Sequence, residues 1–301
     1  MVYKVKRFFE ALENVLYNFY EVIKSLVKLL VLSRFYIKVP KATRDVCFVI
    51  GNGPSFKSVL QSNLELLKSS ELFCVNNFPS SDEYELLKPG NCVLLDPGYY
   101  PQDISKMNPV LSKTIHDIVS KTNWKLNLFI PVLASKAKHL TSLPSKNRNV
   151  TVYFYNYTII KGFKFFRNFL FSRNLGMPQC QNVLGATIFL AVNSGYKKVY
   201  LIGADHTIGK NIFVNENNEL CMIHEHFYSD GKKTITPAYN PNVSKKRLNI
   251  AEFYQLCVKT FTTYYILEEY AKGKNAKIYN LSEGSYIDAF ERKNINDLKI
   301  G

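Results

Sequence analysis

VCFVIGNGPSFKSVL, residues 46–60, is the stretch that decides the fold. Five apolar residues are followed at once by a turn that holds Gly51 and Gly53, and then by apolar residues at helical spacing. A continuous apolar run of this kind is typical of a strand that is covered on both faces of a sheet. Pro54 suits the first turn of a helix. The stretch therefore predicts a β-strand that turns sharply into an α-helix.

Six further short apolar runs are spread along the chain and resemble the first one. They are residues 71–76, 92–96, 126–132, 150–156, 197–203 and 276–281. Helix candidates lie between the runs, at about 55–68, 101–121, 182–194 and 248–272. Strands that alternate with helices predict an α/β fold, Rossmann-like and doubly wound around a mostly parallel sheet.

Two stretches interrupt this alternation. Residues 157–179 are aromatic and basic together, whereas residues 207–245 are polar and rich in turn signals. A connection as long as the second stretch is often a lid over a binding site. We predict one Rossmann-like domain over 45–292 with a lid at about 207–245, preceded by an N-terminal segment over 1–40.

The N-terminal segment carries its own signal. Over residues 1–38, apolar side chains recur at helical spacing from Phe8 to Leu30, with seven basic and three acidic residues, a net charge of +4. No apolar run reaches the roughly 18 residues that a bilayer span requires. A basic amphipathic helix rich in Phe, Tyr and Leu is typical of a membrane interface. Packing on the domain or on a second subunit of a homo-oligomer is the alternative.

The composition limits the classes of protein that fit. Disorder is excluded, because 47% of the 301 residues are hydrophobic and offset the entropy lost on folding. The six cysteines form no CxxC pair, so they predict reduced thiols in the core and a cytoplasmic location. The net charge of +15 calls for an anionic partner. No nucleic-acid-binding motif occurs, so we expect no nucleic acid partner. The basic N-terminal helix instead favours a peripheral position on the inner face of the membrane.

In an open α/β sheet, ligands bind beyond the carboxyl ends of the strands, so the residues that follow the strands are candidates. The donor-binding candidates are Gly51, Asn52, Gly53, Pro54 and Ser55 after the first run, Asn76 and Asn77 after the second, and Asp96 and Gly98 after the third. The glycines allow a ligand to approach the backbone, and a helix start at Ser55 favours an anion such as phosphate. A tight structural turn is the alternative, because the third Gly of the dinucleotide fingerprint and the Lys of a P-loop are both missing.

A carboxylate and several imidazoles supply acid–base candidates. Asp205 and His206 are adjacent after the run at 197–203, and His224 and His226 lie in the predicted lid. We expect acid–base catalysis or substrate contact from this group. There are two alternatives: His224 and His226 bind a metal, or they are surface histidines with no chemical role. We expect no metal and no cofactor, and we expect structural roles for the remaining histidines, His116 and His139.

Four motifs carry a resemblance to a known family. IGNGPS (50–55), FCVNNF (73–78), LLDPGYY (94–100) and NSGYKKVYLIGAD (193–205) resemble, in order and spacing, the core of the bacterial sialyltransferases of the Campylobacter type. The same core is similar to that of the hydroxymethylpterin-pyrophosphokinase-like family. The tail YNLSEGSYIDAF (279–290) resembles that second family more closely.

The sialyltransferase resemblance implies a nucleotide-binding domain with a mobile lid, a CMP-activated acidic sugar as donor, and inversion without a metal. It implies that Asn52 and Gly53 approach the donor phosphate and that Asn76 contacts the nucleotide. Asp96 stands where that family has an Asn that contacts CMP. The lid base would be His226 or His224, and Tyr228 or Tyr239 would contact the leaving phosphate.

The sequence therefore predicts a glycosyltransferase. It would move an acidic sugar that resembles sialic acid or Kdo from a CMP-activated donor to a cell-surface glycan or a lipid-linked acceptor. The alternative is Mg²⁺-dependent diphosphate transfer from ATP to a pterin alcohol, with Asp96 and Asp205 as the carboxylates that hold the metal. A third interpretation is a non-catalytic protein that binds a nucleotide sugar.

Overall fold

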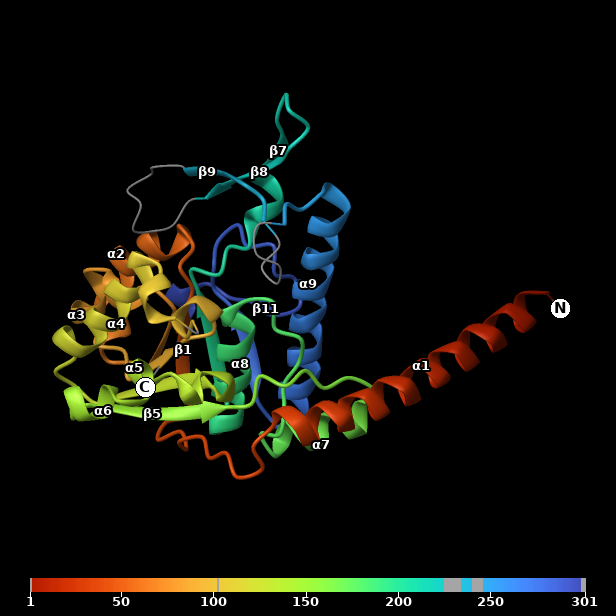
Figure 1. Ribbon diagram of the computed structural model, residues 1–301, viewed down its shortest axis with the longest axis horizontal. Helices are drawn as coiled ribbons and strands as arrows, with labels where there is room; N and C mark the ends of the chain where they lie inside the picture. The colour runs from red at the N-terminus through yellow and green to blue at the C-terminus, as the bar shows by residue number, and fades with distance from the viewer. Residues whose placement is uncertain (1, 102, 225–233, 240–245, 299–301) are drawn as a thin grey trace.

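The computed structural model describes residues 2–101, 103–224, 234–239 and 246–298. Its centre is an eight-stranded sheet in the order β11-β10-β6-β1-β2-β3-β4-β5, in which every neighbouring pair is parallel (Figure 1). The strands are β1 (Val46–Ile50), β2 (Leu72–Val75), β3 (Asn91–Val93), β4 (Leu126–Pro131), β5 (Val150–Tyr155), β6 (Lys198–Ile202), β10 (Lys277–Asn280) and β11 (Glu291–Arg292). All seven predicted strands are confirmed. Of the eight strands of this sheet, the sequence did not predict β11, which has two residues.

Helices cover both faces of the sheet. One face carries α2 (Ser55–Lys68), α3 (Glu83–Leu87), α4 (Pro109–Lys121), α5 (Lys138–Thr141) and α6 (Leu143–Lys146), and the other carries α7 (Lys164–Ser172), α8 (Val183–Ser194) and α9 (Ile250–Gly273). Side chains along each strand alternate between two cores: Cys47 and Val49 lie in one, Phe48 and Ile50 in the other. The predicted doubly wound α/β fold is confirmed.

The order of the strands reverses beside β1. The chain runs from β1 outward to the edge strand β5 and then returns through α8 to form β6 on the other side of β1. The register pairs Val46 with Lys198 and Ile50 with Ile202, so both strands end at the same level. The turns that follow β1 and β6 therefore start side by side, at the topological switch point where α/β folds bind ligands.

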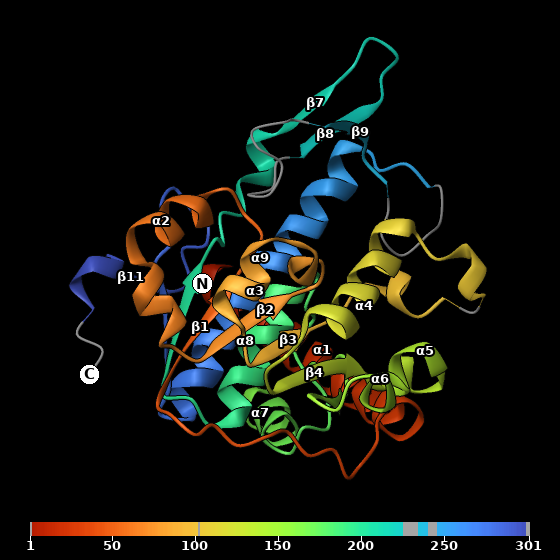
Figure 2. The ribbon, with the colours of Figure 1, turned by 90° about the vertical axis from the view of Figure 1, so that its left-hand side faces the viewer.

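The stretch predicted as a lid contains a second, smaller sheet. Strands β7 (Ile212–Val214), β8 (Leu220–His224) and β9 (Thr234–Pro237) are antiparallel and stand above the carboxyl ends of the large sheet, next to the start of α9 (Figures 1 and 2). A small apolar cluster joins this sheet to α9 and consists of Leu220, Ala238, Leu248 and Phe253. The described part of the insertion is therefore a packed β-sheet rather than an irregular loop.

The N-terminal segment is one long helix, α1 (Val2–Leu32), which projects away from the domain (Figure 1). The helix ends at Leu32, six residues before the end of the 1–38 stretch that showed helical spacing. Just after it, Ser33 Oγ donates to the Leu175 carbonyl (2.7 Å) and the Arg34 amide donates to Asn156 Oδ1 (2.9 Å). Within the described residues, no helix is both long enough and apolar enough to cross a membrane. All six cysteines are free thiols, and five of them are buried, as predicted.

Candidate functional site

The turns that follow β1 and β6 pack backbone against backbone. The Gly51 amide donates to the Ile202 carbonyl (2.8 Å), and the Gly53 amide donates to the Gly203 carbonyl (2.9 Å). Gly203 has φ +64°, and a Cβ on it would lie 2.5 Å from the Gly51 carbonyl oxygen. A Cβ on Gly53 would lie 2.7 Å from the Gly203 oxygen. These glycines are thus required where the two turns meet, whatever ligand lies above them.

The start of α2 already has an anionic partner within the chain. Ser55 donates to Asp205 through its hydroxyl (2.9 Å) and through its backbone amide (3.3 Å). A carboxylate is stabilised at a helix N-terminus by the helix dipole. The prediction that the Ser55 amide is open to a phosphate is therefore not met in this structure, because Asp205 occupies that position.

A pocket of about 510 Å³ lies over these turns. Its floor is formed by residues 51–54 and 203–207, and the start of α8, from 181 onward, forms one side. The apolar wall comes from β8 and from the first half of α9, and includes Met222, Ile223, Phe253, Leu256 and Phe261. Asn52 reaches into this floor, and its side-chain Oδ1 is buried without a hydrogen-bond partner among the described residues. A buried acceptor without a hydrogen bond destabilises the fold unless a ligand or a water molecule donates the missing hydrogen bond.

His206 is held in an unusual position in the same pocket. Its φ is +50°, and a hydrogen bond of 2.9 Å joins its Nε2 to the hydroxyl of Tyr264. Asn182, which caps α8, donates to the same hydroxyl (3.1 Å). Burial lowers the pKa of His206 from 6.5 to about 4, so the ring is neutral at pH 7. A neutral imidazole with so low a pKa is a weak general base, and its role here is to hold hydrogen bonds.

We predict a pH dependence of stability that comes from His206. The pKa of His206 is lower in the folded protein than in the unfolded chain. The free energy of unfolding that the neutral ring contributes is therefore complete above pH 6.5 and is lost as the pH falls towards 4. A full shift of this size corresponds to about 3 kcal/mol, and we expect about 2 kcal/mol because part of the ring lines the pocket.

Urea unfolding of the wild type and of His206→Asn at pH 7, 5.5 and 4 measures this contribution. Asn tolerates positive φ and does not titrate. Between pH 7 and pH 4, the free energy of unfolding of the wild type should fall by about 2 kcal/mol more than that of the variant. Equal losses in the two proteins would contradict the account.

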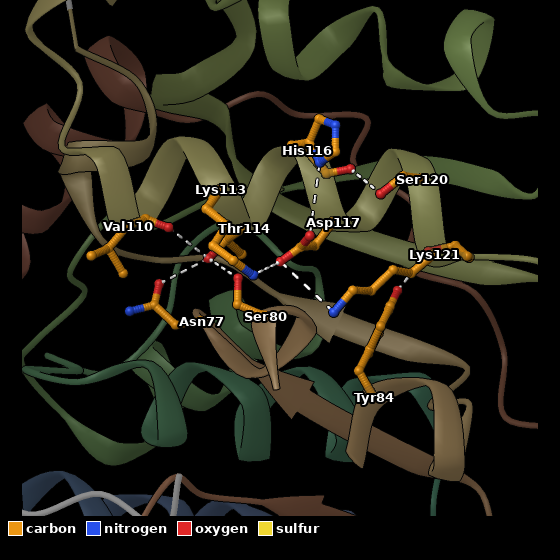
Figure 3. A network of polar contacts seen from close by, with 11 residues as sticks. Asn77, Ser80, Tyr84, Val110, Lys113, Thr114, His116, Asp117, Ser120 and Lys121 are labelled. Carbon is orange, nitrogen blue, oxygen red and sulfur yellow. Dashed lines mark hydrogen bonds and ion pairs between the residues drawn. The ribbon is translucent and has the colours of Figure 1, made fainter. Parts of the chain in front are cut away.

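The candidate residues that follow β2 and β3 form hydrogen bonds within nearby turns and with α4. The Leu95 amide donates to Asn76 Oδ1 (3.1 Å), and the Gly98 amide donates to Asp96 Oδ1 (2.8 Å). Asn77 accepts hydrogen bonds from Tyr99 and from Thr114 of α4. Figure 3 shows the contact of Asn77 with Thr114, which also meets Ser80, next to the Asp117 ion pair with Lys113 (2.6 Å) and Lys121 (3.9 Å).

These polar groups therefore cap turns and join α4 to the sheet. Asn76, Asn77, Asp96 and Gly98 do not line the pocket, to which this part of the chain contributes Val75. The structure thus brings Gly51, Asn52, Gly53 and Pro54 together with Asp205 and His206. It leaves Asn76, Asn77, Asp96 and Gly98 outside the pocket.

The histidine and tyrosine candidates of the lid are only partly described. His224 is the last residue of β8 and directly follows Met222 and Ile223, which line the pocket. His226 and Tyr228 lie outside the described residues. Tyr239 lines the pocket.

The two histidines predicted to be structural lie elsewhere. Nε2 of His139 is 2.7 Å from the Tyr99 carbonyl oxygen, and His116 is exposed on α4, 3.8 Å from Asp117. In the part of the chain that the structure describes, no cluster of three or more His, Cys, Asp or Glu side chains is placed to share a metal ion.

Several pocket residues were not predicted from the sequence. Asn182 carried a weak signal, because an Asn that precedes a helical run is a typical N-cap. The α9 residues of the apolar wall carried none, because their spacing is that of an ordinary buried helix face. Their place in the pocket follows from the way α9 packs beside α8 and β10.

Comparisons with known proteins give a limited result. No model of a known protein family matches the sequence, and neither does any curated protein. Among solved structures, the chain is similar to the MAf glycosyltransferase from Magnetospirillum magneticum AMB-1, with 10% sequence identity and a TM-score of 0.49. The match covers 93% of this chain and 38% of that one, so the chain spans well under half the length of that protein. A similarity at this level does not establish a shared activity.

Proposed function

We propose that the chain is a glycosyltransferase whose donor is a nucleotide-activated sugar. The observation that carries the proposal is the pocket at the β1–β6 switch point, with the unpaired Oδ1 of Asn52 in its floor. Its volume of about 510 Å³ lies in the range of roughly 300–1,000 Å³ that small-molecule sites occupy. Apolar residues from α9 would pack against the flat base, and the glycine turns would lie below the phosphate and sugar.

We propose a CMP-activated acidic sugar as the donor. The resemblance of residues 50–55 and 193–205, which contribute to the pocket floor, to the Campylobacter-type sialyltransferases supports this choice. The Asn52 side chain is also chemically suited to it, because it lines the pocket and an amide can form hydrogen bonds with the cytosine ring or with a ribose hydroxyl. The acceptor would be a surface glycan or a lipid-linked sugar with a free hydroxyl.

In the reaction, an acceptor oxygen forms a bond to the anomeric carbon as the bond from that carbon to the phosphate oxygen breaks. The acceptor proton passes to a general base, and the nucleotide leaves as the monophosphate. His206 is poorly suited to take this proton, because its pKa is about 4 and its Nε2 is bonded to Tyr264. We propose that the base is His224 or His226, since β8 leads from the pocket wall directly to His224.

Binding of CMP to Asn52→Ala tests the proposed donor site. The variant should bind CMP about tenfold or more weakly, because a hydrogen bond to the ligand is lost. Its thermal stability should not fall, since the lost Oδ1 has no hydrogen-bond partner in the part of the chain that the structure describes. Isothermal titration calorimetry and a melting curve measure the two quantities, and the exposed Asn14→Ala on α1 is the matched control.

Two results would overturn the proposal. One is equal affinity of Asn52→Ala and the wild type for CMP. The other is that the wild type binds none of CMP, UDP or GDP. Binding of ATP alone, and only with Mg²⁺, would favour diphosphate transfer instead.

A further inference from the structure

Helix α1 contacts the domain through its polar side. Glu21 and Ser25 are buried there, one turn apart, and Leu29 follows one turn later. Ser25 Oγ accepts from the Lys161 amide (2.9 Å) and donates to the Lys161 carbonyl (3.2 Å). The backbone approaches so closely that a Cβ on Gly162 would lie 2.6 Å from Val22. This docking orients the whole helix with respect to the domain.

The opposite side of α1 is apolar and exposed. We call it the α1 strip and define it by Phe8, Leu12, Phe19, Ile23 and Leu30. Phe8 is 64% exposed, Phe19 56% and Leu30 71%. At 100° per residue, the mean direction of the strip lies about 130° round the helix axis from that of the buried Glu21, Ser25 and Leu29. An amphipathic helix normally buries its apolar side in the protein, and α1 does the reverse.

The residues of the strip repeat every eleven positions. Phe8, Phe19 and Leu30 form one row, and Leu12 and Ile23 form another. Eleven residues make just over three whole turns, so each row runs nearly parallel to the helix axis. From Phe8 to Leu30 the strip is about 33 Å long. A straight strip of this length matches a flat surface such as that of a bilayer.

The exposed apolar surface continues from α1 onto α7. The ring of Phe19 contacts that of Phe163 (5.0 Å between centroids), which stacks on Phe165 (6.0 Å). Phe165 is 77% exposed, and the exposed ring of Phe169 lies under the Arg173 guanidinium (5.4 Å). Exposed phenylalanines beside basic groups are typical of surfaces that enter the headgroup region of a bilayer.

The charge on this surface also favours lipid over a second copy. Helix α1 carries five basic and three acidic residues, and Lys4, Lys6 and Arg7 gather near its outer end. The whole chain has a net charge of +15, so two copies repel each other while an anionic bilayer attracts both.

We propose that the α1 strip, together with Phe165 and Phe169 of α7, is a docking surface for an anionic lipid bilayer. Helix α1 lies in the plane of the interface, with the strip among the acyl chains and its polar side fixed to the domain. This inference does not depend on the proposed glycosyl transfer, because it concerns a surface outside the pocket.

Co-sedimentation of the full chain with vesicles tests the inference. The wild type should bind vesicles of phosphatidylcholine and phosphatidylglycerol, and bind more weakly to phosphatidylcholine alone. The vesicle partition coefficient of the triple variant Phe8→Ser, Phe19→Ser, Leu30→Ser should be about tenfold or more lower than that of the wild type. Its far-UV circular dichroism and CMP binding should not change, because the three side chains are exposed.

The control variant is Ala11→Ser, Asn14→Ser, Tyr17→Ser, which changes three exposed residues of α1 outside the strip and should bind vesicles nearly as the wild type does. Failure of the wild type to bind anionic vesicles would overturn the inference, as would equal binding by the triple variant. A wild-type dimer in light scattering that binds no vesicles, and that the triple variant converts to a monomer, would assign the strip to a second copy instead.

Discussion

Replacing His224 and His226 together by alanine is expected to slow the release of CMP from a CMP-activated acidic sugar by about 10²–10⁴-fold. This is the usual contribution of a general base, and it would be lost completely only if both candidates are removed. Slow hydrolysis of the donor, in which water replaces the acceptor, can be followed without knowledge of the acceptor. Chromatographic detection of released CMP gives the rate.

His206→Asn is the matched comparison for this experiment. We expect it to retain most of the activity, because the neutral His206 ring does not accept the proton and Asn tolerates its positive φ. Full activity in the double His224/His226 variant would show that the base lies elsewhere. A loss in His206→Asn as large as that in the double variant would contradict the structural role assigned to this residue.

Replacing Gly51 by alanine is expected to destabilise the protein by about 3 kcal/mol or more. The new Cβ would collide with the Gly203 carbonyl oxygen, which is a backbone atom held in the β6 turn and unable to move aside. The two turns would have to separate and break the hydrogen bonds between β1 and β6 at the switch point. The melting temperature should fall by about 5–10 °C.

Gly273→Ala is the control for this variant. A Cβ at Gly273 meets no atom within 4 Å, and its place at the end of α9 makes the change neutral or slightly stabilising. A loss of less than about 1 kcal/mol in Gly51→Ala would show that the contact between the turns is not needed.

The sheet was predictable because its strands are buried on both faces and therefore read as continuous apolar runs. VCFVI at 46–50 and LNLFIPV at 126–132 are clear examples, and both became strands. β7 and β11 were not predictable, since they have three and two residues and are largely exposed. Runs this short carry no period that distinguishes them from a loop.

The role of the glycine turn could only partly be predicted. Its position after the first strand indicated a tight turn at a ligand site. The sequence does not show that Gly51 packs against Gly203, about 150 residues away, or that Asp205 takes the start of α2. Such contacts depend on the parallel pairing of β1 with β6, which no local pattern encodes.

Asn77 and Asp96 illustrate the opposite case. Polar residues after strands predicted ligand contacts, but both side chains satisfy nearby turn and helix groups. Asn and Asp are common at strand ends for exactly this local reason. In α1, the sequence predicted an amphipathic helix but could not tell which side would face the domain, and the polar side does.

The central claim is that a nucleotide occupies the pocket between the turns of β1 and β6. An NMR titration of the ¹⁵N-labelled full chain with CMP tests it most directly. The account predicts saturable shifts of the Asn52 side-chain amide and of the backbone amides of Gly53 and His206, with Gly273 unmoved. Shifts confined to residues around Asn77 and Asp96, or no saturable shift at residues 51–53 and 205–206, would contradict it.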